Sequence, residues 1–272
     1  MRILFIVFAL LILQSCEKFS YEIENLNDNE IQVLGHGGMG IHSLLPMNSV
    51  ESFLECIDMG AQGSEIDIQL SKDGYLVAFH DEYLCESTTG EGEIRMLNWS
   101  EIKQFRYKDY SVSSNYSIQL VSDLISSLDS KDDLIFSFDC KLYSSDIDIT
   151  AYYNAFTDSI ISLVESFEID CFVESENIEF LQVLQSKKPD YKLLYYPSAF
   201  DEGYDVINTN GFYGLSISTE QITHQEVELA HNNGYWITIW NVHTKKRNKE
   251  TILKSPDCIQ TDKLCNLLSL LE

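Results

Sequence analysis

The sequence of 272 residues is poor in proline and in basic residues, and each shortage argues against a class of protein. Four prolines and no low-complexity tract argue against a flexible linker inside the chain. Lysine and arginine number 18 against 43 aspartates and glutamates, so the formal net charge is −25 and nucleic acid is not an expected partner. The hydrophobic fraction of 44% is enough for a sizeable core and argues against a disordered chain.

The N-terminus carries an apolar run that is too short to span a bilayer but suits an export signal. The run covers residues 3–13, follows Arg2 and ends in Leu13-Gln14-Ser15-Cys16. This ending resembles a bacterial lipobox, in which the chain is cut before a cysteine that then carries a lipid. We therefore expect a signal peptide over residues 1–15, a lipid on Cys16 and a polar tether over residues 16–30. The lipid would anchor the domain to a membrane of the bacterial cell envelope, as a periplasmic or surface lipoprotein. An ordinary signal peptide with an incidental cysteine is the alternative.

The other six cysteines show no metal-binding or redox spacing. They are Cys56, Cys85, Cys140, Cys171, Cys258 and Cys265, and no CxxC occurs among them. An even number in an exported chain permits disulfides. Several of them lie in apolar runs, however, which favours buried free thiols.

After residue 30 the chain alternates between short β-rich runs and helix-like segments, which predicts a parallel sheet. Eight runs qualify as strands, at residues 31–38, 64–70, 134–142, 171–176, 191–198, 212–218, 235–242 and 258–262. Helical patterns lie between them, for example at residues 49–60, 148–167, 177–188 and 219–234. Eight strand–helix repeats in about 240 residues suit a closed (β/α)₈ TIM barrel. We expect residues 31–272 to form one α/β domain of this kind.

One further run, residues 75–81, exceeds the count of eight strands. It follows Ser71-Lys72-Asp73-Gly74, whose Asp-Gly pair is a hairpin turn signal. The run is therefore predicted to return antiparallel to the second barrel strand, which brings His80 over the barrel mouth. Residues 83–133 then form a long excursion with one or two helices, over residues 100–109 and 121–129.

Acidic side chains recur near the strand ends, where (β/α)₈ barrels place their active sites. Glu65 and Asp67 stand at i and i+2 of one strand and so face the same side, and Asp139 and Lys141 repeat this spacing on the next barrel strand. Two carboxylates so close repel each other unless a cation or a proton lies between them. Oxygen ligands without a Cys or His cluster suit a hard divalent cation, and we predict Ca²⁺ or Mg²⁺.

Two histidines flank the predicted cation site. His36 ends the first strand and His80 ends the returning strand, and two imidazoles can serve as general base and general acid because their pKa lies near neutrality. Asp81 is expected to orient a histidine or cap the turn. Lys141 and the cation can offset negative charge on a phosphoryl group. Trp240, late on the seventh strand, either lines the pocket or packs the barrel.

The sequence resembles the glycerophosphodiester phosphodiesterase family. The resemblance rests on LGHGG, PMNS, GSEIDIQLSKDGYLVAFHD, STTGEGEI, FDCK, ITIWNV and IQTD, in this order, and covers roughly residues 31 to 265. It implies a (β/α)₈ barrel that hydrolyses a small-molecule glycerophosphodiester to glycerol 3-phosphate and an alcohol with the help of a divalent cation. The implied cation ligands are Glu65, Asp67 and Asp139, the implied catalytic residues His36 and His80, and the implied substrate contacts Lys141 and Trp240.

Three family positions differ in this chain. The usual HRG is His36-Gly37-Gly38 and the usual PEN is Pro46-Met47-Asn48, so a phosphate-binding arginine and a glutamate are both missing. We interpret the two losses as one ion pair removed together, which is less damaging than stranding either charge. The third carboxylate is Asp139, where the family has glutamate.

These departures leave two alternatives to the family activity. The phospholipase D toxins of spider venoms also resemble this chain, lack the same arginine and carry Asp-x-Lys on the third strand, which suggests cleavage of intact phospholipids. The other alternative is an inactive barrel that binds a phosphodiester or glycan; against it, both histidines, all three carboxylates and the lysine are retained. The remaining histidines are interpreted as surface residues without a role, namely His42, His224, His231 and His243, although His42 lies near the mouth.

Overall fold

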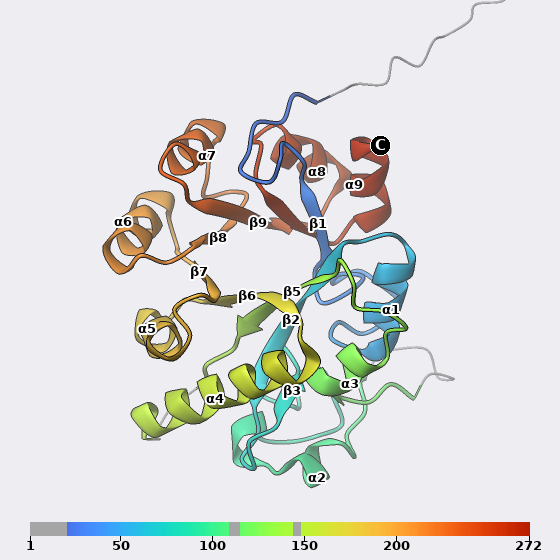
Figure 1. Ribbon diagram of the computed structural model, residues 1–272. Helices are drawn as coiled ribbons and strands as arrows, with labels where there is room; N and C mark the ends of the chain where they lie inside the picture. Colours follow the sequence, from blue (N-terminus) through green and yellow to red (C-terminus); the bar gives the residue numbers. More distant parts are fainter. Residues whose placement is uncertain (1–20, 109–114, 144–147) are drawn as a thin grey trace, which may run out of the picture.

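The computed structural model describes residues 21–108, 115–143 and 148–272, and it shows the predicted closed barrel (Figure 1). The eight barrel strands are β1 (Gln32–Gly35), β2 (Gly63–Leu70), β5 (Ile135–Cys140), β6 (Asp170–Ser175), β7 (Lys192–Tyr195), β8 (Gly214–Ser218), β9 (Trp236–Val242) and β10 (Cys258–Thr261). All pairings between them are parallel, in the order β1-β10-β9-β8-β7-β6-β5-β2. The barrel closes where β1 meets β2, through the single register pair of Gly35 with Ser64. The (β/α)₈ prediction is confirmed.

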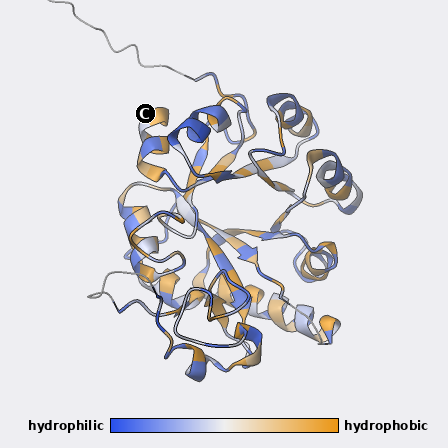
Figure 2. Ribbon diagram, turned by 180° about the vertical axis from the view of Figure 1, so that it is seen from behind, coloured by the Kyte–Doolittle hydropathy of each residue, from blue (hydrophilic) through white to orange (hydrophobic). Residues whose placement is uncertain are grey.

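Helices surround the barrel, and several begin with a side-chain cap. They are α1 (Val50–Asp58), α2 (Trp99–Ile102), α3 (Val121–Ser126), α4 (Ile149–Phe167), α5 (Ile178–Lys187), α6 (Phe200–Asn210), α7 (His224–His231), α8 (Lys245–Ile252) and α9 (Leu264–Leu271). Ser49 caps α1 by accepting the backbone N–H of Ser52, and Thr223 caps α7 in the same way. Hydrophilic and hydrophobic residues alternate along the helices (Figure 2), as expected for helices with one buried face.

The interior of the barrel is apolar at one end and polar at the other. One buried apolar cluster fills the N-terminal end of the barrel. Its members come from five different strands and are Leu34, Phe172, Leu194, Trp236 and Cys258. The next side chains along the strands are polar. Gln260 on β10 donates to Glu174 on β6, across the barrel from it. The apolar plug supports a polar mouth at the C-terminal ends of the strands.

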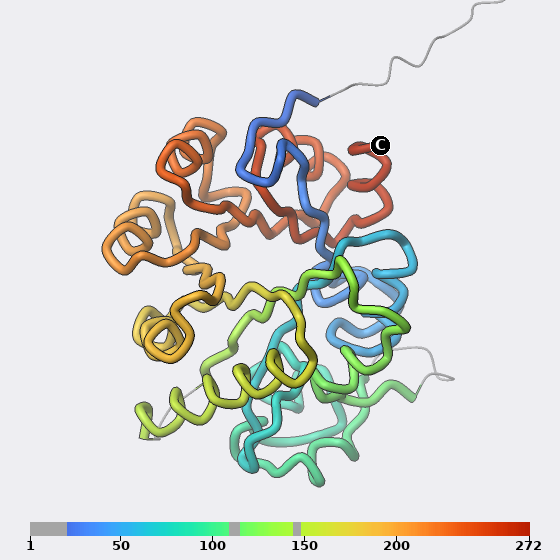
Figure 3. Tube along the Cα trace, in the orientation of Figure 1, coloured from blue at the N-terminus to red at the C-terminus, as the bar shows by residue number. Residues whose placement is uncertain are grey.

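The segment after β2 returns as predicted. Strand β3 (Leu76–Ala78) is antiparallel to β2, and β4 (Gln119–Leu120) pairs with β3. Between them the excursion has its own small core, formed by Val77, Phe79, Leu84, Ile94, Ile102 and Ile118. The tube in Figure 3 shows this segment to one side of the barrel, next to α3 and α4. It places the end of the returning strand, and with it His80, at the mouth.

The described part of the N-terminal region, residues 21–30, packs against the barrel. Asn25 Nδ2 donates to the carbonyl oxygen of Pro256 at 2.8 Å, and the backbone N–H of Leu26 donates to Asp257 Oδ1 at 2.7 Å. The predicted signal peptide, the lipid site Cys16 and the first residues of the tether lie outside the described residues. Among the residues with assigned structure, no helix combines the length and apolar character that crossing a membrane requires.

Candidate active site

The ends of β2 and β5 bring the three predicted carboxylates together. Asp67 on β2 is in register with Asp139 on β5, and Glu65 lies two residues earlier on β2. One carboxylate oxygen from each lies within 4.8 Å of the other two. Glu65 and Asp67 are 2% and 1% exposed, whereas Asp139 is partly exposed toward the mouth. The parallel register of two neighbouring strands thus builds the cluster that the i, i+2 spacing predicted.

One carboxylate oxygen of this cluster, Oε1 of Glu65, has no hydrogen-bond partner among the described residues. Glu65 Oε2 accepts the backbone N–H of Gly37 at 2.8 Å, while Glu65 Oε1 is buried. A buried polar group left unpaired costs about 1–3 kcal/mol, and more when it is charged. The neighbouring side chains of Asp67 and Asp139 cannot donate when they are ionised. An oxygen-binding cation fits this donor set, because it would satisfy Oε1 and relieve the repulsion between the carboxylates.

Burial and charge act unequally on the three acids. Burial, reinforced by the charges of Asp67 and Asp139, raises the pKa of Glu65 well above its usual value. Burial also raises the pKa of Asp139, although Lys141 opposes this shift. Burial acts to raise the pKa of Asp67 too, but Lys141 and the nearby histidines outweigh it and lower that pKa to about 2. The cluster therefore holds one firmly ionised carboxylate and two whose charge lacks sufficient compensation.

Lys141 and Asn48 bind the carboxylate that stays ionised. Lys141 Nζ lies 3.0 Å from Asp67 Oδ1 and donates to Asp139 Oδ2 at 2.7 Å. Burial would lower the pKa of Lys141, but these two carboxylates raise it well above its usual value. Asn48 donates to Asp67 Oδ2 at 2.7 Å and accepts the backbone N–H of Asp67 at 3.0 Å. Asn48 was not among the predicted site residues, although it belongs to the Pro46-Met47-Asn48 motif.

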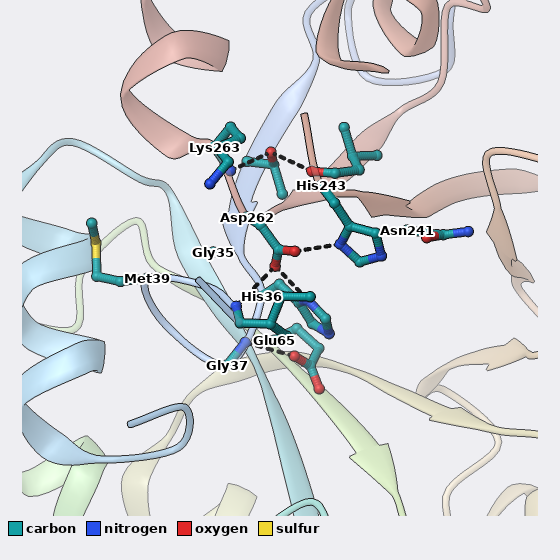
Figure 4. A network of polar contacts seen from close by, with 12 residues as sticks. Gly35, His36, Gly37, Met39, Glu65, Asn241, His243, Asp262 and Lys263 are labelled. Carbon is teal, nitrogen blue, oxygen red and sulfur yellow. Dashed lines mark hydrogen bonds and ion pairs between the residues drawn. The ribbon is translucent and has the colours of Figure 1, made fainter. Parts of the chain in front are cut away.

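His36 shares an acid with a second histidine (Figure 4). Its Nδ1 lies 2.7 Å from Asp262 Oδ1, and Asp262 Oδ2 is bonded to Nδ1 of His243. Burial acts to raise the pKa of Asp262, but the hydrogen bond and charge of His36, together with those of His243, lower it. His243 is not a lone surface residue, since its side chain is only 30% exposed and is bonded to a fully buried acid. Asp262 was also missed, although it directly follows β10 as His36 directly follows β1.

His80 faces the mouth from the opposite side. Its Nδ1 lies 2.9 Å from Asp81 Oδ1, so Asp81 contacts the histidine as expected. This hydrogen bond is the main reason why the pKa of His80 is raised above 6.5 and the pKa of Asp81 is lowered. A cavity of about 240 Å³ lies between the two histidines, and its lining includes His36, His80, Asn48, Ile41, Met47 and Phe79.

The two positions that depart from the family motifs lie against each other. Gly37 has a φ of +54°, and a Cβ at this position would lie 2.6 Å from Cε and 2.9 Å from Cβ of Met47. A side chain at position 37 therefore points at position 47. This contact supports the interpretation that an arginine and a glutamate were lost together as one pair.

Glu174 is a fourth buried acid that was not predicted from the sequence. It lies on β6 in register with Asp139, and it accepts hydrogen bonds from Ser137 and Gln260. Burial, followed by the charge of Asp139, raises its pKa to about 7. A glutamate directly after the apolar residues Cys171, Phe172 and Val173 was the signal available in the sequence.

Trp240 lies on β9 with its ring centroid 4.8 Å from that of Tyr196, which follows β7. Its indole Nε1 is buried and has no hydrogen-bond partner within the described part of the chain. The side chain is only partly buried and packs on Tyr196. The packing role expected for Trp240 is thus observed, and its role in lining the pocket stays a prediction.

The remaining histidines and the cysteines lie apart from the carboxylate cluster. His42 is exposed, and His224 is bonded to the carbonyl of Lys254. His231 is largely buried at the N-terminal end of the barrel, where it binds Asp257, so it is structural rather than a surface residue. Cys56, Cys140, Cys171 and Cys258 are buried free thiols as predicted, whereas Cys85 and Cys265 are free and exposed.

Ionisable groups of both signs therefore surround the end of the barrel at which this fold places catalysis. The fold and the site together define a (β/α)₈ barrel whose mouth brings two histidines beside a cluster of carboxylates that could hold a cation. The chain belongs to the glycerophosphoryl diester phosphodiesterase family, whose model matches residues 39–265. This match confirms the family and the enzyme class, that of a hydrolase of glycerophosphodiesters.

Individual relatives agree along most of the chain. The glycerophosphodiester phosphodiesterase of Caldanaerobacter subterraneus is 26% identical over 229 residues, which are 83% of this chain and 92% of that protein. The enzyme of the same name from Bacillus altitudinis is 22% identical over 82% of this chain and 91% of its own length.

Solved structures show the same fold. An Oleispira antarctica phosphodiesterase in complex with the product sn-glycerol-3-phosphate has a TM-score of 0.76 at 20% identity, over 88% of this chain and 96% of that one. A glycerophosphodiester phosphodiesterase from Parabacteroides distasonis has a TM-score of 0.74 at 19% identity, over 89% and 96% of the two chains.

Proposed function

We propose that this enzyme hydrolyses glycerophosphodiesters to glycerol 3-phosphate and an alcohol, with a divalent cation on Glu65, Asp67 and Asp139 and with His36 and His80 as proton-transfer residues. The observation that carries this proposal is the orphaned Oε1 of Glu65 inside a cluster of three carboxylates, with one imidazole on either side. The glycerol 3-phosphate in the Oleispira structure supports the choice of product.

The donor set selects the kind of cation. Three carboxylates offer only oxygen, which suits Mg²⁺ or Ca²⁺ better than a softer ion. When bound, the ion supplies positive charge that stabilises the charge developing on the phosphoryl oxygens. Lys141 adds to that charge: two of its three N–H donors meet Asp67 and Asp139, and the third can donate to a phosphoryl oxygen.

The two histidines have different proton roles. His80 carries the raised pKa because Asp81 stabilises its protonated form, so it is the general acid that protonates the departing alkoxide. His36 donates from Nδ1 to Asp262, which leaves Nε2 with its lone pair. His36 Nε2 then removes the proton from the attacking oxygen, either of water or of a neighbouring hydroxyl of the substrate. Asp262 and Asp81 act through the imidazoles, as positioning residues.

A second candidate activity is cleavage of intact phospholipids. The lining of the cavity between the histidines favours it, because Ile41, Met47 and Phe79 are apolar where the family motif has a charged pair close by. Apolar lining suits a substrate whose alcohol group carries hydrocarbon. The predicted lipid on Cys16 would hold the enzyme beside such substrates, and this anchor stays a prediction.

Phosphorus NMR of the full chain tests both activities. Glycerophosphocholine and phosphatidylcholine vesicles are supplied in turn with Mg²⁺, with Ca²⁺ and with chelator. Cation-dependent release of glycerol 3-phosphate is the expected result, whereas a cyclic or lipid phosphate from the vesicles would favour the second candidate. His36→Ala and Glu65→Ala should each lose at least about 10²–10⁴-fold in rate. His42→Ala and Glu55→Ala, at exposed positions, are the matched controls. Full activity of both site variants would refute the assignment.

A further inference from the structure

We propose that His36, His243 and Asp262 form a second cation site of different chemistry, which takes a borderline transition ion such as Zn²⁺ and inhibits the enzyme when filled. The inhibition rests on the proposed role of His36 in proton transfer, whereas the binding itself does not. The site lies at the same mouth as the carboxylate cluster but shares no ligand with it.

The three side chains already bring possible ligand atoms close together. One ring nitrogen from each histidine and one oxygen of Asp262 lie within 4.8 Å of one another. Each oxygen of the Asp262 carboxylate is bonded to Nδ1 of one histidine, and the two ring centroids are 6.4 Å apart. Figure 4 shows both rings converging on this acid. Ligand bonds of about 2.0–2.2 Å to a tetrahedral ion separate donor atoms by about 3.3 Å, so the 2.7 Å contact between His36 and Asp262 has to widen by roughly half an ångström.

The backbone holds these ligands in place. They follow or end three strands that are neighbours in the barrel, β1, β10 and β9. The backbone N–H of Asp262 donates to the carbonyl of Val242 at 3.2 Å, and that of His36 donates to the carbonyl of Thr261 at 3.4 Å. The side chain of Asp262 is fully buried, while those of His36 and His243 are 21% and 30% exposed. An ion can therefore enter from the mouth and meet ligands whose supports are already ordered.

The ligand chemistry separates this site from the carboxylate cluster. Two imidazoles and one carboxylate suit Zn²⁺ or Co²⁺, with water in the open position. Mg²⁺ and Ca²⁺ prefer oxygen and gain little from imidazole. In excess Mg²⁺ the oxygen cluster of Glu65, Asp67 and Asp139 is filled, and a transition ion is directed to the histidines.

Binding there removes the proton acceptor from the reaction. The ion takes the place of the Nδ1 proton. In a neutral ring that proton moves to Nε2, and in a protonated ring it passes to the solvent while Nε2 keeps its own, so binding strengthens as pH rises. A His36 ring bound to the ion through Nδ1 carries its one remaining proton on Nε2. That nitrogen has no lone pair left to accept a proton from the attacking oxygen, and hydrolysis stops until the ion leaves.

His243 makes the site testable without damage to the hydrolytic centre. The substitution His243→Asn retains an N–H donor for Asp262 but replaces an imidazole ligand with an amide, which is a poor ligand for Zn²⁺. The expected turnover of His243→Asn in Mg²⁺ alone is close to that of the native chain. His42→Asn is the matched control, because His42 is an exposed histidine outside the cluster.

The experiment titrates Co²⁺ into the full chain in excess Mg²⁺ and records visible absorption, and then measures inhibition of phosphodiester hydrolysis by Zn²⁺. We expect intense bands of a four-coordinate Co²⁺ site, loss of at least about 100-fold in Co²⁺ affinity in His243→Asn, and no change in His42→Asn. Zn²⁺ should inhibit the native chain and the control at concentrations that leave His243→Asn active.

Three outcomes would overturn the proposal. They are equal Co²⁺ affinity in His243→Asn and the native chain, an equal loss in His42→Asn, and a Co²⁺ spectrum of purely oxygen coordination. The absorption bands do not depend on turnover, so an inactive chain with His243-dependent bands would refute the proposed function and leave the second site standing. An active chain without such bands would do the reverse.

Discussion

Glu65→Gln should make the chain more stable than the native chain when no cation is bound, and less stable when a cation is bound. In the cation-free chain, Glu65 Oε1 is buried without a hydrogen-bond partner among the described residues, and its surroundings are acceptors on Asp67 and Asp139. Glu65→Gln replaces that oxygen by an NH₂ group that can donate to those carboxylates, while the remaining oxygen still accepts the N–H of Gly37. Removing the unpaired buried charge should raise the free energy of unfolding by about 1–3 kcal/mol.

With the cation bound, the native chain should have a higher free energy of unfolding than Glu65→Gln. A site filled at 100 times its Kd stabilises the native chain by about 2.7 kcal/mol, and the amide forfeits most of this gain. A change of 2 kcal/mol corresponds to about 4–8 °C in Tm for a chain of this size.

The pH dependence of stability has a definite sign, because burial raises the pKa of Glu65 in the folded chain. The native chain therefore loses stability as pH rises above the unfolded value of about 4.3, so the advantage of Glu65→Gln in chelator should grow from pH 5 to pH 8.

Thermal unfolding followed by circular dichroism, with chelator and with Mg²⁺ or Ca²⁺, provides the measurement. Asp67→Asn is the contrasting variant, because its pKa of about 2 reflects compensation by Lys141 that the amide abolishes. Asp67→Asn should lose about 2–3 kcal/mol without cation, and more with cation because Asp67 is itself a proposed ligand. The reasoning would be refuted if Glu65→Gln lowered the Tm in chelator, or if the cation stabilised this variant as much as the native chain.

Two further predictions concern the positions at which the chain departs from the HRG and PEN motifs, and His80 as the proposed general acid. Gly37→Arg alone should cost about 2 kcal/mol, because position 37 has a φ of +54° and its Cβ would meet Met47 at 2.6 Å. Gly37→Arg with Met47→Glu should recover about 1 kcal/mol of this in a double-mutant cycle of urea unfolding, and strict additivity would contradict the inferred pair. Asp81→Asn should move the alkaline limb of the pH profile of kcat/KM to lower pH, since Asp81 raises the pKa of His80 above 6.5. An unmoved limb would show that His80 is not the acid.

The fold was predictable because each barrel strand and helix can be recognised from its own stretch of sequence. Eight apolar runs of strand length alternate with helical patterns, and β2 and β3 are joined by an Asp-Gly turn, so the order of elements already determines a closed parallel barrel. The predicted bounds exceed the strands at several ends. The run 31–38 contains β1, which stops at Gly35, because His36 and the glycines after it turn away from the sheet. Helix α7 starts at His224 rather than at residue 219, because Thr223 caps it.

The site was most readily predicted where its members share a strand or a turn, or where the same spacing recurs on the next barrel strand. Glu65 and Asp67 reveal each other through their spacing, and His80 is placed by the hairpin. The pairing of His36 with Asp262 is different, since these residues are 226 positions apart and meet only because β1 and β10 are neighbours. Such long-range contacts depend on the register of β1 against β10, which local patterns do not encode. The buried Glu174 was missed for the same reason, because its partner Gln260 lies across the barrel.

The way in which the barrel closes also determines when during synthesis the first strand can pair. Strand β1 pairs with β2 through one residue, but with β10 through four. The first strand of the barrel therefore has almost no ladder of its own until the last strand has been made, 261 − 35 = 226 residues later. At about 5–20 residues per second, roughly 11–45 s of synthesis separate the two strands. His36 meets Asp262 only at that moment, so a ribosome-bound or prematurely ended chain carries His36 without the carboxylate that binds its Nδ1.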